Sequence, residues 1–128
     1  MARRTGARLP AAKRGEHPAY IPNAGDLIWL SFTPQAGREQ AGRRPGLVLS
    51  PRAYNAKVGL CLVCPVTGQA KGYPFEVALP TGLPVQGVVL ADHVKSADWQ
   101  ARNSEHIAIT PAEVVEEVCA KLKPLLGM

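Results

Sequence analysis

The sequence predicts a mainly β fold with a C-terminal helix, in which short strands curl into a small antiparallel barrel. From residue 26 onward, short apolar runs alternate with glycine and proline, as is typical of strands joined by turns. No long amphipathic helix lies between these runs to make a parallel crossover, so antiparallel pairing is favoured. With 128 residues and 46% hydrophobic content, the chain is long enough for one compact core, and we expect a single domain.

Five segments carry the strand pattern, and glycine or proline separates them. In chain order they read DLIWLSF (26–32), GLVLS (46–50), GLCLVCPV (59–66), PFEVAL (74–79) and GVVLADHVKS (87–96).

The C-terminal segment TPAEVVEEVCAKLKPLLGM predicts a helix. Thr110, followed by Pro111 and Glu113, matches a capping box with proline at the first helical position. The apolar residues that repeat on one face are Val114, Val118 and Leu122. Pro124 cannot donate a backbone hydrogen bond, so the helix should stop or kink there.

The N-terminal residues 1–23 are rich in Ala, Arg, Gly and Pro and show no periodicity, so we expect a flexible basic tail followed by a folded domain over 24–128. Met1 to His17 holds five basic residues and one acidic residue, and therefore most of the formal charge of +5. The segment from Arg38 to Arg102 contains eight basic and four acidic residues, which indicates a locally positive surface.

Three cysteines indicate no disulfide framework and fit a reducing compartment. Cys61 and Cys64 have the spacing of a metal or redox pair, but residues three apart in a strand point to opposite faces. We therefore expect both to be buried as small apolar side chains. No apolar run is long enough to cross a bilayer and no signal peptide is evident, so we expect a soluble, cytoplasmic protein without membrane contact.

The segment GREQAGRRPGLVLSP (37–51) places a charged loop directly before an apolar strand. Charges between strands ordinarily form a solvated turn, so the loop alone indicates no function. Together with GDLIWLSF, YNAKVGLC, PVTGQAKGYPFEV and GVVLADHVKSADW, in this order, it resembles the MazF/PemK family of toxin endoribonucleases. The resemblance covers about Gly25 to Met128, and it is specific because three separate segments match.

The resemblance implies an SH3-like barrel that forms a homodimer. It also implies the toxin of a type II toxin–antitoxin system, which cuts single-stranded mRNA at short sequences without the ribosome, a metal or a cofactor, and so stops translation and growth. Cleavage in this family uses the 2′-hydroxyl of the RNA and leaves a 2′,3′-cyclic phosphate and a 5′-hydroxyl. Such an internal nucleophile asks little of the protein beyond alignment. The sequence shows no carboxylate cluster for metal ions, and the two cysteines with metal-pair spacing are expected to point apart.

The catalytic arginine and threonine of the family fall on Arg44 and Thr67. A guanidinium offers planar donors to the phosphate oxygens on which charge accumulates, and the threonine hydroxyl can add another hydrogen bond. Arg44 stays protonated and cannot serve as a simple base. Glu39 is the candidate base, although it could equally orient Arg43 or Arg44 through a salt bridge, and both readings stay open.

Further residues are candidates for RNA contact. The predicted RNA-binding residues are Arg38, Arg43, Gln69, Lys71 and Lys95. Tyr73 is an aromatic candidate for base stacking, whereas Phe75 and Trp29 are expected in the core. His93 follows Asp92, but neighbours in a strand point apart, so we leave His93 out of catalysis.

The expected partners are single-stranded mRNA and a MazE-like antitoxin, whose acidic, disordered C-terminal segment would occupy the RNA groove. DNA would be reached only through the antitoxin. Trp99, Leu125 and Leu126 are large apolar groups near the end of the chain that favour a homodimer. Two alternatives stay open: a CcdB-like toxin that binds DNA gyrase, and a degenerate member acting only in autoregulation. The ending PLLGM lacks the tryptophan of gyrase poisons and favours the nuclease.

Overall fold

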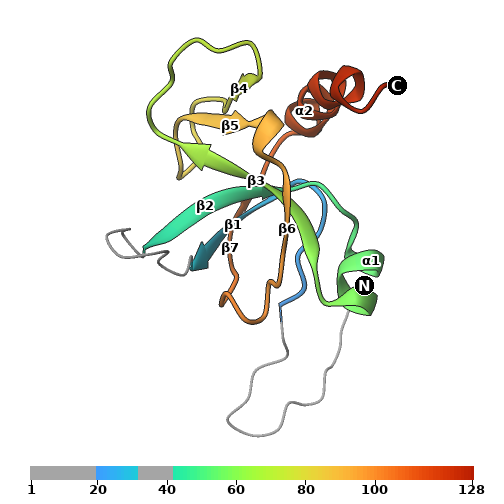
Figure 1. Cartoon of the computed structure of the whole chain (residues 1–128). Coiled ribbons are helices and arrows are strands. Elements are labelled where there is room, and N and C mark those ends of the chain that lie inside the picture. The colour runs from blue at the N-terminus through green and yellow to red at the C-terminus, as the bar shows by residue number, and fades with distance from the viewer. Residues whose placement is uncertain (1–19, 32–41) are drawn as a thin grey trace, which may run out of the picture.

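The computed structural model describes residues 20–31 and 42–128, which form an antiparallel sheet flanked by two helices (Figure 1). The predicted site residues Arg38 and Glu39 and most of the predicted tail lie outside the described residues. The elements in chain order are β1 (Asp26–Ser31), β2 (Arg43–Val48), α1 (Arg52–Val58), β3 (Cys61–Thr67), β4 (Glu76–Ala78), β5 (Val88–Leu90), the 3-10 turn η1 (Ala91–His93), β6 (Lys95–Ala97), β7 (Glu105–Ile109) and α2 (Ala112–Leu125).

All strand pairs are antiparallel, which confirms the predicted class of mainly β with a C-terminal helix. The strand order is β4-β5-β3-β2-β1-β7, and β6 also pairs with β3. The two ends of β3 thus have different neighbours: Val63 pairs with Lys95 of β6, and Val66 pairs with Val89 of β5. The segment 87–96 is therefore not one strand, because η1 turns the chain between β5 and β6.

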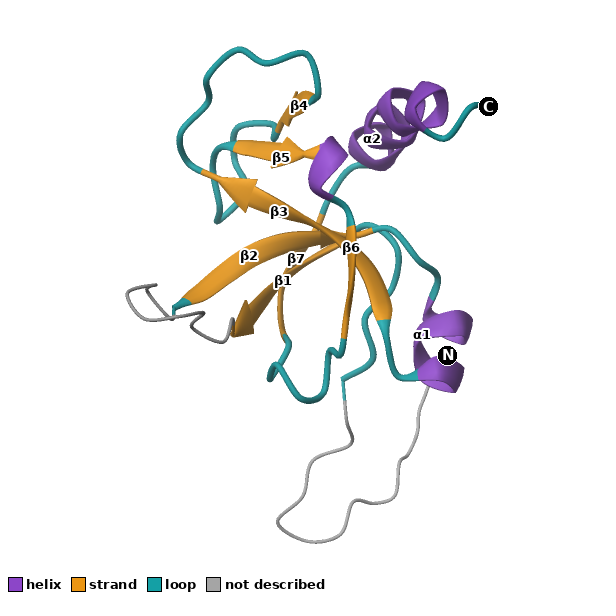
Figure 2. Cartoon of the chain, viewed as in Figure 1, coloured by secondary structure: helices purple, strands orange, loops and turns teal. Residues whose placement is uncertain are grey.

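Two apolar clusters lie on the two faces of the sheet, where the sequence predicted one core. Alternate residues of β1 show the division, since Leu27 belongs to the first cluster and Ile28 and Leu30 to the second. The first cluster contains Leu27, Leu47, Cys64, Val66, Val77, Leu79, Val85, Val89, Ala91, Val114, Val118 and Leu122. The second cluster contains Ile28, Leu30, Val48, Cys61, Val63, Ala97 and Trp99. Figure 2 shows the helices apart from each other, with α1 beside the start of β3 and α2 beside β5 and η1.

The two cysteines of β3 confirm the prediction that they point to opposite faces. Cys61 is fully buried in the second cluster and Cys64 in the first. Burial disfavours the charged thiolate and raises the pKa of Cys61 to about 11 and that of Cys64 to about 12. These thiols pack as apolar groups and cannot share a metal ion.

Helix α2 has the predicted buried face, but its predicted capping box is wrong. The helix begins at Ala112, after Pro111, and no side chain caps its N-terminus. The hydroxyl of Thr110 instead donates to the carbonyl of Gly25 at 2.8 Å, which ties the start of the helix to β1. The helix ends at Leu125, one residue after Pro124, as expected for a residue without an N–H.

Residues Tyr20 to Asn23, which the sequence assigns to the tail, pack on the second cluster. Tyr20 and Ile21 contact it, and the carbonyl of Pro22 accepts a hydrogen bond of 2.8 Å from Asn55. Asn55 lies in α1, a helix that the strand pattern did not predict. No helix among residues 20–31 and 42–128 is long and apolar enough to cross a membrane.

Candidate functional site

Arg44 and Thr67 are brought together by the pairing of β2 with β3. Gly46 lies opposite Pro65 where the pairing ends, and Arg44 and Thr67 each lie two residues beyond that pair, on the same side of it. Residues that face each other across two antiparallel strands project from the same side of the sheet. The two predicted catalytic residues therefore share one surface, although they are 23 positions apart in the sequence.

Both residues line a pocket of about 280 Å³, which we call the Arg44 pocket. Its lining residues are Arg44, Pro65, Val66, Thr67, Gln69, Lys71, Tyr73, Glu76, Leu90 and His93. A second hollow of about 460 Å³, between the start of β2 and Gln86, shares Arg44 and Thr67 with it. The predicted catalytic pair therefore lies between the two hollows and lines both.

The hydroxyl of Thr67 is held in place by its neighbours. Its oxygen accepts a hydrogen bond of 3.2 Å from the N–H of Gln69, so the hydroxyl hydrogen stays available for a phosphate oxygen. Gly87 packs directly against the backbone here, because a Cβ at this position would lie 2.1 Å from the carbonyl oxygen of Thr67. A glycine with φ of +128° is thus required for β3 to end where it does.

The loop 68–75 carries three of the lining residues and is closed by Glu76. The carboxylate of Glu76 accepts hydrogen bonds from the N–H groups of Lys71 and Gly72 at 2.9 to 3.2 Å. Lys71 and Gln69 line the Arg44 pocket, and their predicted contacts with RNA stay predictions. Glu76 was not predicted from the sequence, because its contacts depend on a turn that no residue pattern indicates.

Arg43 lies beside Arg44 in β2 and also lines the second hollow, but its guanidinium is bound by residues of the neighbouring strands. Its guanidinium donates to the hydroxyl of Ser31 and to the carbonyl of Asn103, each at 2.7 Å, and forms an ion pair of 3.2 Å with Glu105. These contacts join the ends of β1, β2 and β7. The structure gives Arg43 a structural role, and its predicted contact with RNA stays a prediction.

Lys95 adds positive charge near the pocket from β6. Burial lowers the pKa of Lys95, and the nearby charges of Arg102 and Arg44 lower it further. Lys95 therefore lies within the electrostatic range of both Arg102 and Arg44. By contrast, the guanidinium of Arg44 forms no hydrogen bond or ion pair with any residue of 20–31 or 42–128, and it is exposed.

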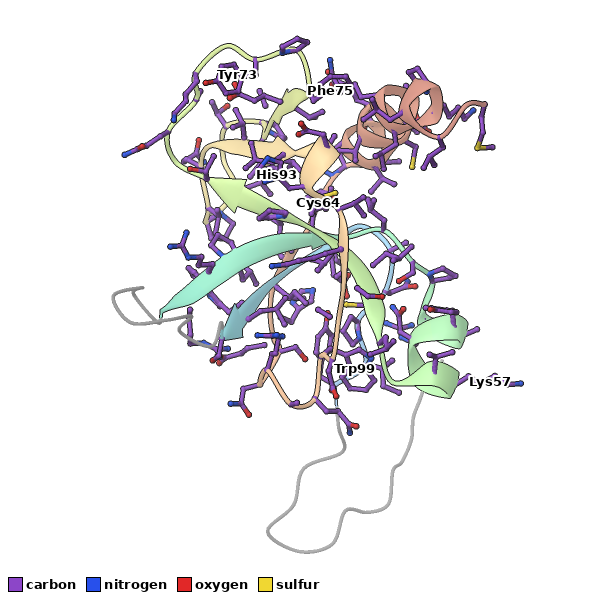
Figure 3. All side chains as sticks on the ribbon, in the orientation of Figure 1. Lys57, Cys64, Tyr73, Phe75, His93 and Trp99 are labelled. Carbon is purple, nitrogen blue, oxygen red and sulfur yellow. The ribbon has the colours of Figure 1, made fainter. Side chains whose placement is uncertain are left out.

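His93 lines the Arg44 pocket, and the reason given for leaving it aside is wrong. Asp92 and His93 lie in η1 rather than in a strand, and His93 Nε2 is 3.9 Å from Asp92 Oδ1. Figure 3 shows His93 near β3 and β5, with Tyr73 on the loop before β4. The signal in the sequence was the Asp-His pair itself, which was misread because the turn was not predicted.

The aromatic predictions divide as expected. Tyr73 is 61% exposed and lines the pocket, whereas Phe75 and Trp29 pack against the first cluster. Trp99 is buried and donates from Nε1 to the carbonyl of Asn55 at 3.1 Å, so it closes the second cluster and presents no exposed dimer surface. In residues 20–31 and 42–128, no three His, Cys, Asp or Glu side chains gather as a metal site would require.

The comparisons with known proteins show the family of the chain. Residues 23–126 match the family described as "PemK-like, MazF-like toxin of type II toxin-antitoxin system". The chain belongs to this family. Among family members, it is 50% identical over 108 residues to "Endoribonuclease toxin MazF" of Escherichia coli (strain K12), which covers 84% of this chain and 96% of that protein. It is 36% identical over 108 residues to "Endoribonuclease toxin ChpB" of the same organism, covering 80% of this chain and 91% of that protein.

Solved structures of family members have the same fold. The crystal structure of MazE-MazF (Form-II) from Deinococcus radiodurans matches with a TM-score of 0.82 and 63% identity, covering 86% of this chain and 99% of that chain. MazF (Form-I) from the same organism matches with a TM-score of 0.78 and 63% identity, covering 86% of this chain and 100% of that chain. The mainly β fold with a C-terminal helix is thus that of the family.

Proposed function

We propose that this family member is a cytoplasmic endoribonuclease toxin that cuts single-stranded mRNA at specific short sequences, without the ribosome, a metal ion or a cofactor. The observation that carries the proposal is the shared pocket of Arg44 and Thr67, with Lys71 and Tyr73 beside them. Cations, a hydroxyl and an exposed aromatic ring are the groups that bind phosphate and stack on an unpaired base. The endoribonuclease names of the relatives point to the same class of activity.

The reaction we propose is an internal transesterification. The 2′-oxygen of the RNA attacks the adjacent phosphorus, and the bond from phosphorus to the 5′-oxygen breaks. Arg44 donates to the equatorial phosphate oxygens as they gain charge, and Thr67 donates its hydroxyl hydrogen. The 2′-hydroxyl proton passes to a base, for which Glu39 is the candidate, and the leaving 5′-oxygen takes up a proton from solvent.

We infer that the protein acts as a homodimer and binds a MazE-like antitoxin. Leu125 and Leu126 are 50% and 65% exposed at the end of α2, and they are candidates for a surface that a second copy covers. The structures named MazE-MazF contain an antitoxin together with a toxin of the same fold. An acidic, disordered antitoxin segment would pair its carboxylates with Arg44 and Lys71 in place of RNA phosphates, and DNA would be contacted only through the antitoxin.

The test is cleavage of a defined single-stranded RNA by the purified protein in EDTA, followed by analysis of the new ends. We expect cutting to continue in the chelator and to leave 2′,3′-cyclic phosphate and 5′-hydroxyl ends. Loss of activity in EDTA with recovery in magnesium, or 5′-phosphate products, would contradict the mechanism. RNA that stays intact under all conditions would favour gyrase binding or autoregulation instead.

A further inference from the structure

The carboxylate of Glu76 is bound by the backbone of the loop that precedes it. The N–H of Lys71 lies 3.2 Å from Oε1 and 3.0 Å from Oε2, and the N–H of Gly72 lies 2.9 Å from Oε1. The N–H of Glu76 returns a hydrogen bond of 3.1 Å to the carbonyl of Tyr73. Gly72 has a φ of +79°, which glycine adopts without strain. One side chain therefore fixes the path of the loop from Lys71 to Glu76.

An acidic residue in a pocket for RNA needs an explanation, because a carboxylate repels phosphate. Successive N–H groups that point at one anion form a nest, a geometry that often binds phosphate. Here the nest is occupied by the carboxylate of the chain itself, whose charge is partly taken up by the hydrogen bonds. The position of Glu76 is thus explained by the loop it organises and requires no direct contact with RNA.

We propose that Glu76 is a positioning residue for RNA binding, which holds the loop so that Lys71 and Tyr73 face the Arg44 pocket. This role rests on the proposed function. Other hydrogen bonds hold the loop at positions away from Lys71. The N–H of Gln69 donates to the hydroxyl of Thr67, and Lys121 Nζ donates to the carbonyl of Pro74 at 2.8 Å. Without Glu76, the backbone around Lys71 gains freedom that must be lost again when RNA binds.

Replacing Glu76 by glutamine tests this role, because charge repulsion and loop positioning predict opposite changes in RNA affinity. Glutamine keeps one oxygen acceptor but loses the second acceptor and the charge. If charge alone mattered, removing it would tighten RNA binding. If Glu76 positions the loop, binding should weaken about three- to tenfold, or about 0.6–1.4 kcal/mol, because RNA must then order a more mobile loop. The dissociation constant is measured with an RNA that has a 2′-deoxy sugar at the cut position and cannot be cleaved.

Kinetics and amide exchange separate positioning from a general loss of structure. For cleavable RNA, KM should rise in Glu76→Gln while kcat changes little, because Arg44 and Thr67 are untouched. The amides of Lys71 and Gly72 should exchange faster with solvent, whereas those of β2 and β3 should keep their protection. In a Lys71→Ala background, the effect of Glu76→Gln should shrink, because both changes act through the same contact.

Asp92→Asn is the matched control, since it removes a carboxylate close to His93, at the edge of the same pocket, and leaves the loop unchanged. Its RNA binding should be equal to wild type or tighter. Three outcomes for Glu76→Gln would overturn the positioning role and leave the proposed function standing. They are RNA binding like that of the control, unchanged amide protection at Lys71 and Gly72, and an effect that adds fully to that of Lys71→Ala. A wild-type protein that neither binds nor cuts RNA would overturn the proposed function, and this role with it.

Discussion

Replacing Arg44 or its neighbour Arg43 by alanine should separate activity from stability. The two arginines are adjacent in β2 and have the same charge, so any effect of overall charge is matched between the variants. Arg44 lines the pocket with Thr67, whereas the guanidinium of Arg43 is bound by Ser31, Asn103 and Glu105. We expect Arg44→Ala to lose activity and Arg43→Ala to lose mainly stability.

The magnitudes follow from these contacts. Loss of Arg44 removes donors to the developing phosphate charge, which should lower kcat by about 10²- to 10³-fold, or roughly 2.7–4 kcal/mol. Its effect on unfolding should stay within about 0.5 kcal/mol, and relief of the repulsion with Lys95 favours the folded state. Arg43→Ala loses three polar contacts at the surface, which together should cost about 1–1.5 kcal/mol once solvent screening is considered.

Two measurements decide the matter: single-turnover cleavage of an end-labelled RNA, and urea unfolding at one fixed protein concentration. Arg44→Lys is a useful control, because it keeps the charge but loses the planar pair of donors, and its rate should fall between wild type and Arg44→Ala. The reasoning would be refuted if Arg44→Ala cut RNA at nearly the wild-type rate. It would also be refuted if Arg43→Ala lost more activity than Arg44→Ala while remaining folded.

Four further predictions concern stability, thiol access and the homodimer. Asn55→Ala should lower the free energy of unfolding by about 3 kcal/mol in urea titrations, because the fully buried amide makes three hydrogen bonds of 2.6 to 3.0 Å. A thiol reagent at pH 8 should label Cys119 in the folded protein and reach Cys61 and Cys64 only after unfolding, as mass spectrometry of the peptides would show. Since burial raises the pKa of Cys61 from 9.0 to about 11, the unfolded chain loses that proton first, and stability should fall as pH rises through this range. Leu126→Glu should shift the sedimentation mass from two chains to one, while a wild-type mass of one chain would contradict the homodimer.

Much of the fold could be predicted from the sequence because the central strands are buried on both faces. Such strands read as continuous apolar runs, as in β1 and β3, and the pattern places them in the sheet even when their partners are unknown. Helix α2 was predicted for a similar reason, since one face is apolar. Its start was misjudged because Thr110 has a tertiary partner, the carbonyl of Gly25, in place of the helix N-terminus.

The missed elements depend on contacts distant in sequence. Helix α1 has no apolar face. Its one buried side chain, Asn55, donates hydrogen bonds from its amide to the carbonyls of Pro22 and Ser50. Strand β7 has mostly exposed or half-buried residues and follows Asn103, which has a positive φ. In the site, the resemblance supplied Arg44 and Thr67, while the turn at η1 and the fold of the loop at Glu76 were not readable from spacing.

The charges around the pocket bear on the proposal that RNA and the antitoxin bind to the same surface. Burial and the charges of Arg102 and Arg44 lower the pKa of Lys95, so the folded chain holds these cations together at a cost in free energy. A bound polyanion removes that cost, and it gains most at low salt, where screening is weak. The carboxylate of Glu76 cannot remove it, because its acceptors are directed at the backbone of its own loop. The exposed guanidinium of Arg44 stays open to the anions of the proposed partners, RNA phosphates or the carboxylates of an acidic antitoxin segment. Occupation of the pocket by such a segment would then suffice for inhibition, with no change in the sheet.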